Sequence, residues 1–468
     1  MKKFSACTSI LVGKKASLDG TIMIGRNEDA KAAWPKHFVV HQRGELGDQF
    51  VSKETKAKIP LPTPSFKYTA TPEWTSKAGL FEEDGINEFN VAMSATESAY
   101  SNDLVLGLDP LVENGLNEEG MITVVLPFVK TAREGVQRLG KLIAQYGTGE
   151  TNGVLFADDN EAWYFESGAG HYWVAQRIPD DAYAVVGNQL AIQEVDFNDS
   201  RNFLYHPGIQ EFVKQHHLNP QPTGFNFRQI FGTADRSDAI YSTPRVWSGH
   251  QMFSARQATN ETPESQALSF IMKPDHLISV FDVQDYLGSH YQGTPYDPIG
   301  TGDMHDRHRY RPISLAKTQE SHILQMNRPH GNDIHWLAMG VTAESSFVPF
   351  FADINETPAA YRRGKLPAQS NSAYWIFKHA GILVDSDLHN LLPLLEDVQK
   401  NVNQAAIKFI EEMDQAKLNH DSNWEYYITK QNTAFAQQVL RKYQQLTAEL
   451  ITKLTDNSPL NFNTDENL

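Results

Sequence analysis

Two short apolar runs near the start of the chain give the first clear pattern of hydrophobic and polar positions. Residues 8–13 and 21–25 are rich in β-branched and aliphatic side chains, and the turn signal Asp19-Gly20 stands between them. This pattern predicts an antiparallel hairpin. The second run is followed by Arg26-Asn27-Glu28-Asp29. A closed hairpin therefore returns these charged residues to the neighbourhood of Cys7.

Further along the chain, strand patterns dominate and one helix interrupts them. Residues 132–146 place apolar side chains at helical spacing and predict an amphipathic helix. A series of short apolar runs separated by turn residues predicts a meander of antiparallel strands that ends at Gly187-Asn188. The strands expected in this part of the chain are 88–95, 154–157, 162–165, 172–176, 183–186, 322–326 and 334–339.

The pattern becomes helical after residue 370. Residues 388–413 and 432–454 carry long amphipathic repeats that predict two helices. We expect them to form a helical hairpin on the main body, where it serves as a packing or homo-oligomer surface. The chain shows no internal repeat and no glycine-rich phosphate loop.

Composition and charge narrow the class of protein. The chain has 468 residues, of which 40% are hydrophobic and 11% aromatic, as in globular proteins. Its net charge of −16 argues against a nucleic-acid partner, and no apolar run reaches the roughly 18–20 residues of a membrane span. A single cysteine permits no disulfide within the chain, which is typical of a reducing compartment. We therefore expect a cytoplasmic protein with no membrane partner.

That single cysteine, Cys7, is the strongest candidate for chemistry. A reactive thiol needs a positive neighbour that favours the thiolate and a base that takes its proton. The expected hairpin brings Arg26 and a carboxylate near Cys7. The alternative is that Cys7 is a small buried apolar side chain, which is the commoner role of a free cysteine.

The residues before Cys7 allow two interpretations. Phe4-Ser5-Ala6-Cys7 resembles a lipoprotein cleavage box, which would make the chain a lipid-anchored binding protein, but the apolar stretch of roughly 7–15 residues that a signal requires is missing. A leader of residues 1–6 fits better, because its removal makes Cys7 the N-terminus. A free α-amine has a pKa of about 7.7–8.0 and can act as the base. The Cys7 thiol could remove the leader itself by attacking the Ala6 carbonyl.

The loop of residues 285–312 contains a possible metal-binding pattern. His305 and His308 stand three apart beside Asp303 and Asp306. This spacing is generic, no helix supports it, and three arginines, Arg307, Arg309 and Arg311, would repel a cation. We therefore predict no metal and no cofactor.

Several motifs resemble those of a known family. Cys7-Thr8 followed by Gly25-Arg26-Asn27-Glu28-Asp29 resembles the opening of N-terminal-nucleophile cysteine hydrolases related to penicillin V acylase and bile salt hydrolase, and more closely the bacterial dipeptidase A family. The likeness covers most of the chain and is weakest in the helical C-terminal part. The further segments that carry it are 162–166, 171–177, 181–184, 242–247, 296–298, 322–325 and 348–350.

The resemblance implies roles for three residues of the hairpin. Cys7 corresponds to the nucleophile, with its own α-amine as general base. Arg26 corresponds to the arginine whose fixed charge favours the thiolate, and Asp29 to the carboxylate that orients the amine. Glu28, between them, is expected to point away.

The resemblance also implies two residues outside the hairpin. Asn188 corresponds to the asparagine that donates to the tetrahedral oxyanion, and Arg245 to a second arginine near the catalytic centre. Arg245 is also a candidate for binding the substrate carboxylate. The related acylases carry another asparagine after a strand, and none stands at the matching place here. A backbone N–H or the hydroxyl of Ser94 or Thr96 is the expected substitute.

The fold implied by the family is α+β, a four-layer αββα sandwich of the N-terminal-nucleophile hydrolase type with an added C-terminal helical segment. The implied function is a cysteine dipeptidase that hydrolyses a broad range of dipeptides through a thioester on Cys7. The alternative within the superfamily is an amidase of the penicillin V or bile salt type. The expected division of the chain is a leader at 1–6, the hydrolase domain at 7–370, the helical segment at 371–456 and a polar tail at 457–468.

Overall fold

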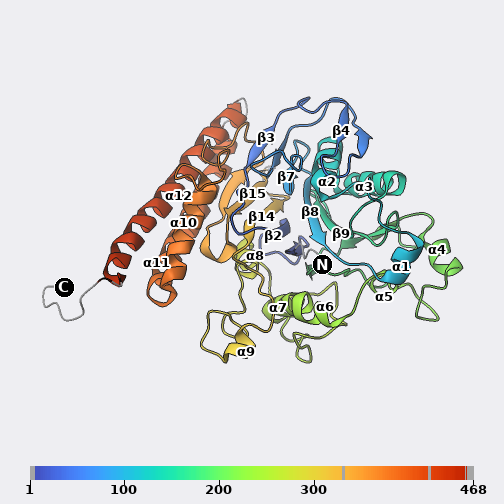
Figure 1. The fold of residues 1–468 in the computed structure, drawn as a ribbon. Helices are drawn as coiled ribbons and strands as arrows, with labels where there is room; N and C mark the ends of the chain where they lie inside the picture. Colours follow the sequence, from blue (N-terminus) through green and yellow to red (C-terminus); the bar gives the residue numbers. More distant parts are fainter. Residues whose placement is uncertain (1–5, 329–331, 420–422, 459, 461–468) are drawn as a thin grey trace.

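The fold is built on two antiparallel sheets with helices around them, in a computed structural model that describes residues 6–328, 332–419, 423–458 and 460 (Figure 1). Both sheets have six strands, and two small two-stranded sheets accompany them. The small sheets are formed by β3 (Val39–His41) with β6 (Tyr68–Ala70) and by β4 (Gln49–Val51) with β5 (Lys58–Pro60).

The first sheet contains the predicted hairpin at its centre. Its strand order is β12-β1-β2-β14-β15-β16, and every neighbouring pair is antiparallel. The hairpin prediction is confirmed, since β1 and β2 pair with Cys7 opposite Glu28 and Ser9 opposite Arg26. The strands are β1 (Ala6–Val12), β2 (Ile22–Asp29), β12 (Tyr183–Val186), β14 (Thr318–Met326), β15 (Ile334–Met339) and β16 (Val348–Phe351).

The second sheet contains most of the predicted meander. Its order is β13-β11-β10-β9-β8-β7, again antiparallel throughout. The last strand expected in the meander, β12, instead crosses to the first sheet and pairs with β1. The strands are β7 (Asp84–Ile86), β8 (Ala92–Ser98), β9 (Asn152–Ala157), β10 (Ala162–Ser167), β11 (Trp173–Ile178) and β13 (Phe203–Tyr205).

Three apolar clusters hold these elements together. One contains Leu11 and Ile24 of the first sheet with Leu155 and Tyr164 of the second, so the two sheets share a core. We call the faces turned toward this core the inner faces. A second cluster joins the other side of the second sheet to α2 and α3, and a third joins the other side of the first sheet to α7, α8 and α10 to α12.

The helices were predicted with mixed success. Helix α3 has the predicted bounds, while α11 and α12 are longer than expected and α10 was missed because most of its residues are buried, which leaves no polar stripe. Among the helices described, none has the length and apolar character of a membrane span. The helices are α1 (Asp103–Leu108), α2 (Glu118–Val125), α3 (Ala132–Tyr146), α4 (Ile209–Gln215), α5 (Phe227–Phe231), α6 (Arg236–Tyr241), α7 (Thr243–Phe253), α8 (Val280–Leu287), α9 (Met304–Arg307), α10 (Ala373–Ser386), α11 (Leu388–Lys417) and α12 (Trp424–Leu454).

Candidate active site around Cys7

Cys7 lies near the start of β1, between the two sheets. Because successive residues of a strand point to opposite faces, Cys7, Ser9 and Leu11 share the inner face of the first sheet. The side chain of Cys7 is only 2% exposed. Residues 1–5 of the predicted leader lie outside the described residues.

Arg26 is the positive neighbour of the thiol. Its Nη1 donates to Cys7 Sγ at 3.1 Å and to the carbonyl of Thr96 at 2.9 Å. Its Nη2 forms a fully buried ion pair with Glu83, 2.5 Å long, and also donates to the carbonyl of Ala95 at 2.8 Å. Thr96, Glu83 and Ala95 all lie on the side of the second sheet. Their bonds hold the Arg26 guanidinium against the Cys7 sulfur.

Burial opposes ionisation of this thiol. Desolvation raises the pKa of Cys7 well above its usual value, Arg26 lowers it, and the carboxylates of Glu97, Glu118 and Asp29 raise it further. With Cys7 joined to Ala6 by a peptide bond, the group is therefore a neutral thiol at pH 7. A further positive charge close to the sulfur is needed to shift it toward thiolate.

A buried hydrogen-bonded chain continues behind Arg26. Arg26 Nε donates to Ser94 Oγ at 3.0 Å, and His322 Nε2 lies 2.8 Å from the same oxygen. The other ring nitrogen of His322 contacts Asp84 at 2.5 Å and Glu320 at 3.0 Å. These carboxylates raise the pKa of His322 to about 9, against the effect of burial, so the ring is an imidazolium at pH 7.

The hydrogen-bonded chain behind Arg26 contains the one group of side chains, within the described residues, whose spacing suits a metal ion. Ligand atoms of Asp84, Glu320 and His322 all lie within 4.8 Å of one another. The imidazolium offsets one of the two carboxylate charges, burial raises the pKa of the Glu320 carboxyl, and the Arg26 guanidinium is two hydrogen bonds away. The arrangement therefore fits an ion-pair network that supports Arg26 better than it fits a cation site.

Arg245 contacts Cys7 from the opposite side of β1. It is fully buried near the start of α7, and its Nη1 donates to the Cys7 carbonyl and to Thr8 Oγ1. Its Nη2 donates to Asn188 Oδ1 at 2.6 Å, while Asn188 Nδ2 donates to the carbonyl of Ser98 at 2.8 Å. Nε donates to the carbonyl of Tyr241. With these donors engaged, Arg245 is poorly placed to receive a substrate carboxylate.

Asp29 lies at the end of β2, opposite Ala6. One carboxylate oxygen accepts from Arg311 and the other from the Thr318 hydroxyl. Arg311 also donates to Thr8 Oγ1 at 3.2 Å, so it joins Asp29 to the strand that carries Cys7. The structure thus brings all five predicted residues into one cluster: Cys7, Arg26, Asp29, Asn188 and Arg245.

Two expectations from the sequence need correction. Glu28 does not point away from the site, because its pairing opposite Cys7 puts it on the same inner face, where it forms an ion pair with buried Lys36 at 3.3 Å. In the sequence, Arg311 stands out only as one of three arginines, with Arg307 and Arg309, that would repel a cation. Arg309 pairs with Glu264 near the surface while Arg311 turns inward, and nothing local in the sequence separates them.

The hydroxyls of Ser94 and Thr96, expected to serve as a second oxyanion donor, differ in the hydrogen bonds that they already make. Ser94 Oγ is engaged by Arg26 and His322. The hydroxyl of Thr96 is buried and has no hydrogen-bond partner in the described part of the chain. Of the two side chains, Thr96 is therefore the one whose oxygen no donor occupies, while Ser94 Oγ accepts from two.

Two buried acids of the site were not predicted. Glu97 on β8 accepts a 2.5 Å hydrogen bond from Ser9 through Oε2, and its Oε1 has no hydrogen-bond partner among the residues described. Burial raises the pKa of Glu97 to about 7, although Arg245, Arg26 and Arg311 lower it. Glu118, at the start of α2, is buried beside the backbone N–H of Thr96, and burial together with Glu83 raises its pKa.

Known proteins are similar to this chain over most of its length. Residues 6–401 match peptidase family C69. The chain belongs to this family. The resemblance inferred from the motifs is thereby confirmed, and the chain is a peptidase.

Relatives in peptidase family C69 are similar over most of their length. A probable dipeptidase of Latilactobacillus sakei is 43% identical, over 100% of this chain and 99% of the relative. Probable dipeptidase B of Lactococcus lactis is 36% identical over 98% of both chains. Dipeptidase A of Lactobacillus helveticus is 38% identical over 86% of this chain and 87% of the relative.

A solved structure is similar at a greater distance. Penicillin V acylase from Agrobacterium tumefaciens shares 16% identity, over 73% of this chain and 86% of the acylase, with a TM-score of 0.33. So remote a likeness supports no inference about substrate or mechanism.

Proposed function

We propose that this member of peptidase family C69 is a cysteine dipeptidase of broad range, with Cys7 as its nucleophile after removal of residues 1–6. Relatives named as dipeptidases, up to 43% identical and covered almost end to end, support the substrate class. The observation that carries the mechanism is the 3.1 Å contact between the Cys7 sulfur and the buried guanidinium of Arg26.

Leader removal supplies the base that the full chain lacks. The Cys7 thiol adds to the Ala6 carbonyl, the Cys7 nitrogen leaves as an amine with the thiol proton, and water hydrolyses the thioester. The new α-ammonium adds a positive charge beside the sulfur and lowers the pKa of the thiol. Asp29, opposite Ala6 in the sheet, is the carboxylate that orients this amine.

Peptide cleavage then uses the same groups. The Cys7 sulfur attacks the scissile carbonyl while the α-amine takes the thiol proton. Asn188, held through its Oδ1 by Arg245, donates to the oxyanion with Thr96 as the second donor. The amine passes its proton to the leaving amino acid, and water that the amine activates hydrolyses the thioester. Arg26 favours the thiolate throughout.

The fold that belongs to this proposal is the four-layer αββα sandwich of the N-terminal-nucleophile hydrolases, within residues 7–370. It is supported by two sheets that share one apolar cluster and by helices packed on their other sides (Figure 1). The division into a helical segment at 371–456 and a tail at 457–468, and the cytoplasmic location, stay predictions from the sequence.

The test combines protein chemistry with substrate comparison. N-terminal sequencing and intact mass of the wild type should show a chain that starts at Cys7, while Cys7→Ala should keep its leader and lose activity. Purified wild type should hydrolyse dipeptides, and slow or fail on tripeptides and on a β-lactam side-chain amide. Full activity with residues 1–6 still attached, or inactivity on every dipeptide, would contradict the proposal.

A further inference from the structure

A dipeptidase of this kind has to hold a positive charge very close to its nucleophile. In a dipeptide the attacked carbonyl belongs to the first residue, whose α-ammonium nitrogen is two bonds away, or about 2.5 Å from the carbonyl carbon. Once Cys7 attacks that carbon, the ammonium cannot lie far from the sulfur. An acidic side chain beside Cys7 is therefore required if free dipeptides are preferred.

Glu97 has the geometry of such an acceptor. It projects from β8 of the second sheet, fully buried, and the bond to Ser9 fixes it against the inner face of the first sheet, which also carries Cys7. Only Oε2 is engaged by that bond, and Oε1 has no hydrogen-bond partner within the described residues. A buried carboxylate oxygen without a partner is costly, so the site is favourable for a cationic donor.

The arginines around Glu97 leave its Oε1 free to accept a hydrogen bond. Arg26 is neutralised by its own ion pair with Glu83, and Arg311 by its ion pair with Asp29. Arg245 acts on Glu97 only at a distance, since its hydrogen bonds go to the oxygens of Tyr241, Cys7, Thr8 and Asn188. Glu118 adds a second buried acid whose field also reaches the thiol.

We propose that Glu97, through its unengaged Oε1, receives the α-ammonium of the dipeptide and so restricts the enzyme to substrates with a free N-terminus. This assignment rests on the proposed dipeptidase function and on Cys7 as nucleophile. The competing occupant is the α-ammonium of Cys7 itself, which would make Glu97 a support for the nucleophile instead of a specificity residue.

The test uses two substrates that differ in one group. Alanyl-alanine has the ammonium, and lactoyl-alanine has a hydroxyl in its place beside the same amide. The wild type should prefer alanyl-alanine by roughly 100-fold or more in kcat/KM, since truncating one partner of a buried charge pair has effects of this size. In Glu97→Gln this preference should fall to within about tenfold, mostly through a higher KM for alanyl-alanine.

A matched control separates this effect from general damage. Glu344 is a partly buried glutamate whose pKa is likewise raised to about 7, but it lies by α10 and α11, away from the thiol. Glu344→Gln should keep the wild-type preference. All chains should be prepared with Cys7 freed by the same introduced protease site, so that a defect in leader removal does not enter the comparison.

A pH series on the wild type gives a second arm that needs no variant. Between pH 7 and pH 5 the dipeptide ammonium stays charged, while Glu97 becomes protonated because burial raises its pKa to about 7. The preference for alanyl-alanine should therefore decline as pH falls. The charged and titratable groups whose fields couple to Glu97 are Cys7, Arg26, Tyr164, Arg245, Tyr286 and Arg311; none of their side chains has an ordinary pKa in that interval.

The outcomes are distinct. An unchanged preference in Glu97→Gln overturns the assignment even if dipeptides are good substrates. An equal loss of kcat on both substrates also overturns it, and points to the enzyme's own ammonium. Failure of the wild type on both substrates refutes the dipeptidase function itself. A flat preference between pH 7 and pH 5 counts against Glu97 even where the variant does not fold.

Discussion

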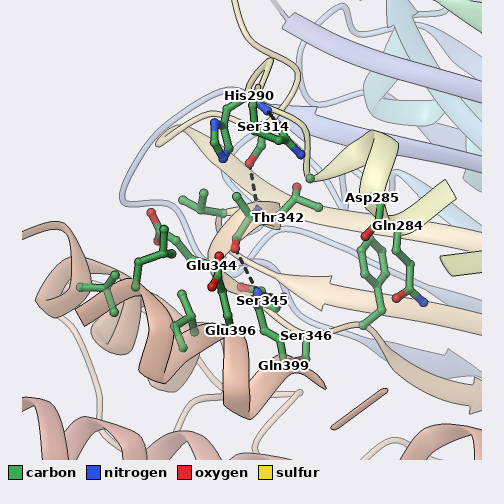
Figure 2. A pocket seen from close by; sticks show the side chains of 18 of the residues that line it. Gln284, Asp285, His290, Ser314, Thr342, Glu344, Ser345, Ser346, Glu396 and Gln399 are labelled. Atoms are coloured by element: carbon green, nitrogen blue, oxygen red, sulfur yellow. Dashed lines mark hydrogen bonds between the residues drawn. The ribbon is translucent and has the colours of Figure 1, made fainter. Parts of the chain in front are cut away.

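Two glutamates, the fully buried Glu97 and the partly buried Glu344, share a raised pKa of about 7 but lie in different regions of the molecule. Glu97 lies between the two sheets beside Cys7, among three arginines. Glu344 borders a cavity of about 710 Å³ where the loop after β15, the loop around Ser314 and helix α11 meet, and Figure 2 shows it near Ser345 and Glu396. The first region carries the candidate chemistry, and the second lies on the far side of the first sheet.

The contrast separates burial from function. In both regions desolvation is the main cause of the raised pKa. The charges that act on the pKa of Glu344 are Asp385 and Lys378 of α10, and Cys7 does not line the cavity. A raised pKa by itself therefore marks a buried acid. Only the position of Glu97 beside a thiol and a fixed guanidinium gives its carboxylate a chemical role.

Of the substitutions that distinguish the two regions, Arg26→Met should have the largest effect, on both stability and the reactivity of Cys7. The change removes the closer of the two cations that pair with buried Glu83 and leaves only Lys36 at 3.6 Å, which costs up to about 3–5 kcal/mol of unfolding free energy. It also removes the cation that favours the thiolate, so the rate of Cys7 alkylation by iodoacetamide at pH 7 should drop along with activity. Denaturant unfolding and alkylation kinetics measure the two effects.

Arg26→Lys is the matched control, because it keeps the charge but loses the forked hydrogen bonds. It should retain part of the alkylation rate and part of the stability. If Arg26→Met reacted with iodoacetamide as fast as the wild type, the guanidinium would have no role in activating the thiol.

The next effect should come from Asn188→Ala, on the other side of β1. Loss of one oxyanion donor should lower kcat by roughly two to three orders of magnitude. The variant should leave the pH dependence of Cys7 alkylation unchanged, since Asn188 contacts Arg245 and the Ser98 carbonyl and not the sulfur. A shifted alkylation profile would mean that Asn188 acts on the thiol and not on the oxyanion.

The sequence could predict those parts of the site that depend on local pattern. The hairpin follows from alternation and one turn, and it alone brings Arg26 and Asp29 to Cys7. The bonds that complete the site join residues far apart in the chain: Ser9 and Glu97 are 88 residues apart, and Asp29 and Arg311 are 282 apart. No local signal encodes such contacts. The crossing of β12 to the first sheet, which brings Asn188 close to Cys7, was likewise invisible to strand patterns.

A smaller effect, on stability only, is expected from Glu344→Gln at the cavity. The pKa of Glu344 in the folded state, about 7, is above its usual value of 4.5. The folded state therefore binds the proton more tightly, and the wild type loses stability as pH rises from 4.5 to 7. Glu344→Gln removes this loss. Relative to wild type it should gain at most about 3 kcal/mol between pH 4.5 and pH 8, from 1.36 kcal/mol per pKa unit.

Urea unfolding at several pH values measures that gain, and kcat/KM on a dipeptide should stay at the wild-type value throughout. A stability difference that does not vary with pH would show that Glu344 does not titrate in this range. A loss of activity would couple the cavity to the site between the sheets, and the contrast between the two regions would fail.

The smallest effect should come from Gln399→Ala, which loosens the wall of the same cavity. Gln399 Nε2 donates to the carbonyls of Ala343 and Ser345, both at 3.0 Å, and so ties α11 to the loop after β15. Loss of these bonds should lower the free energy of unfolding by about 1–2 kcal/mol. Gln404→Ala, on an exposed position of the same helix, should change it by less than about 0.5 kcal/mol. Activity should be unaffected in both, because the tie acts on the outer side of the first sheet while Cys7, Arg26 and Glu97 are fixed by contacts between the sheets.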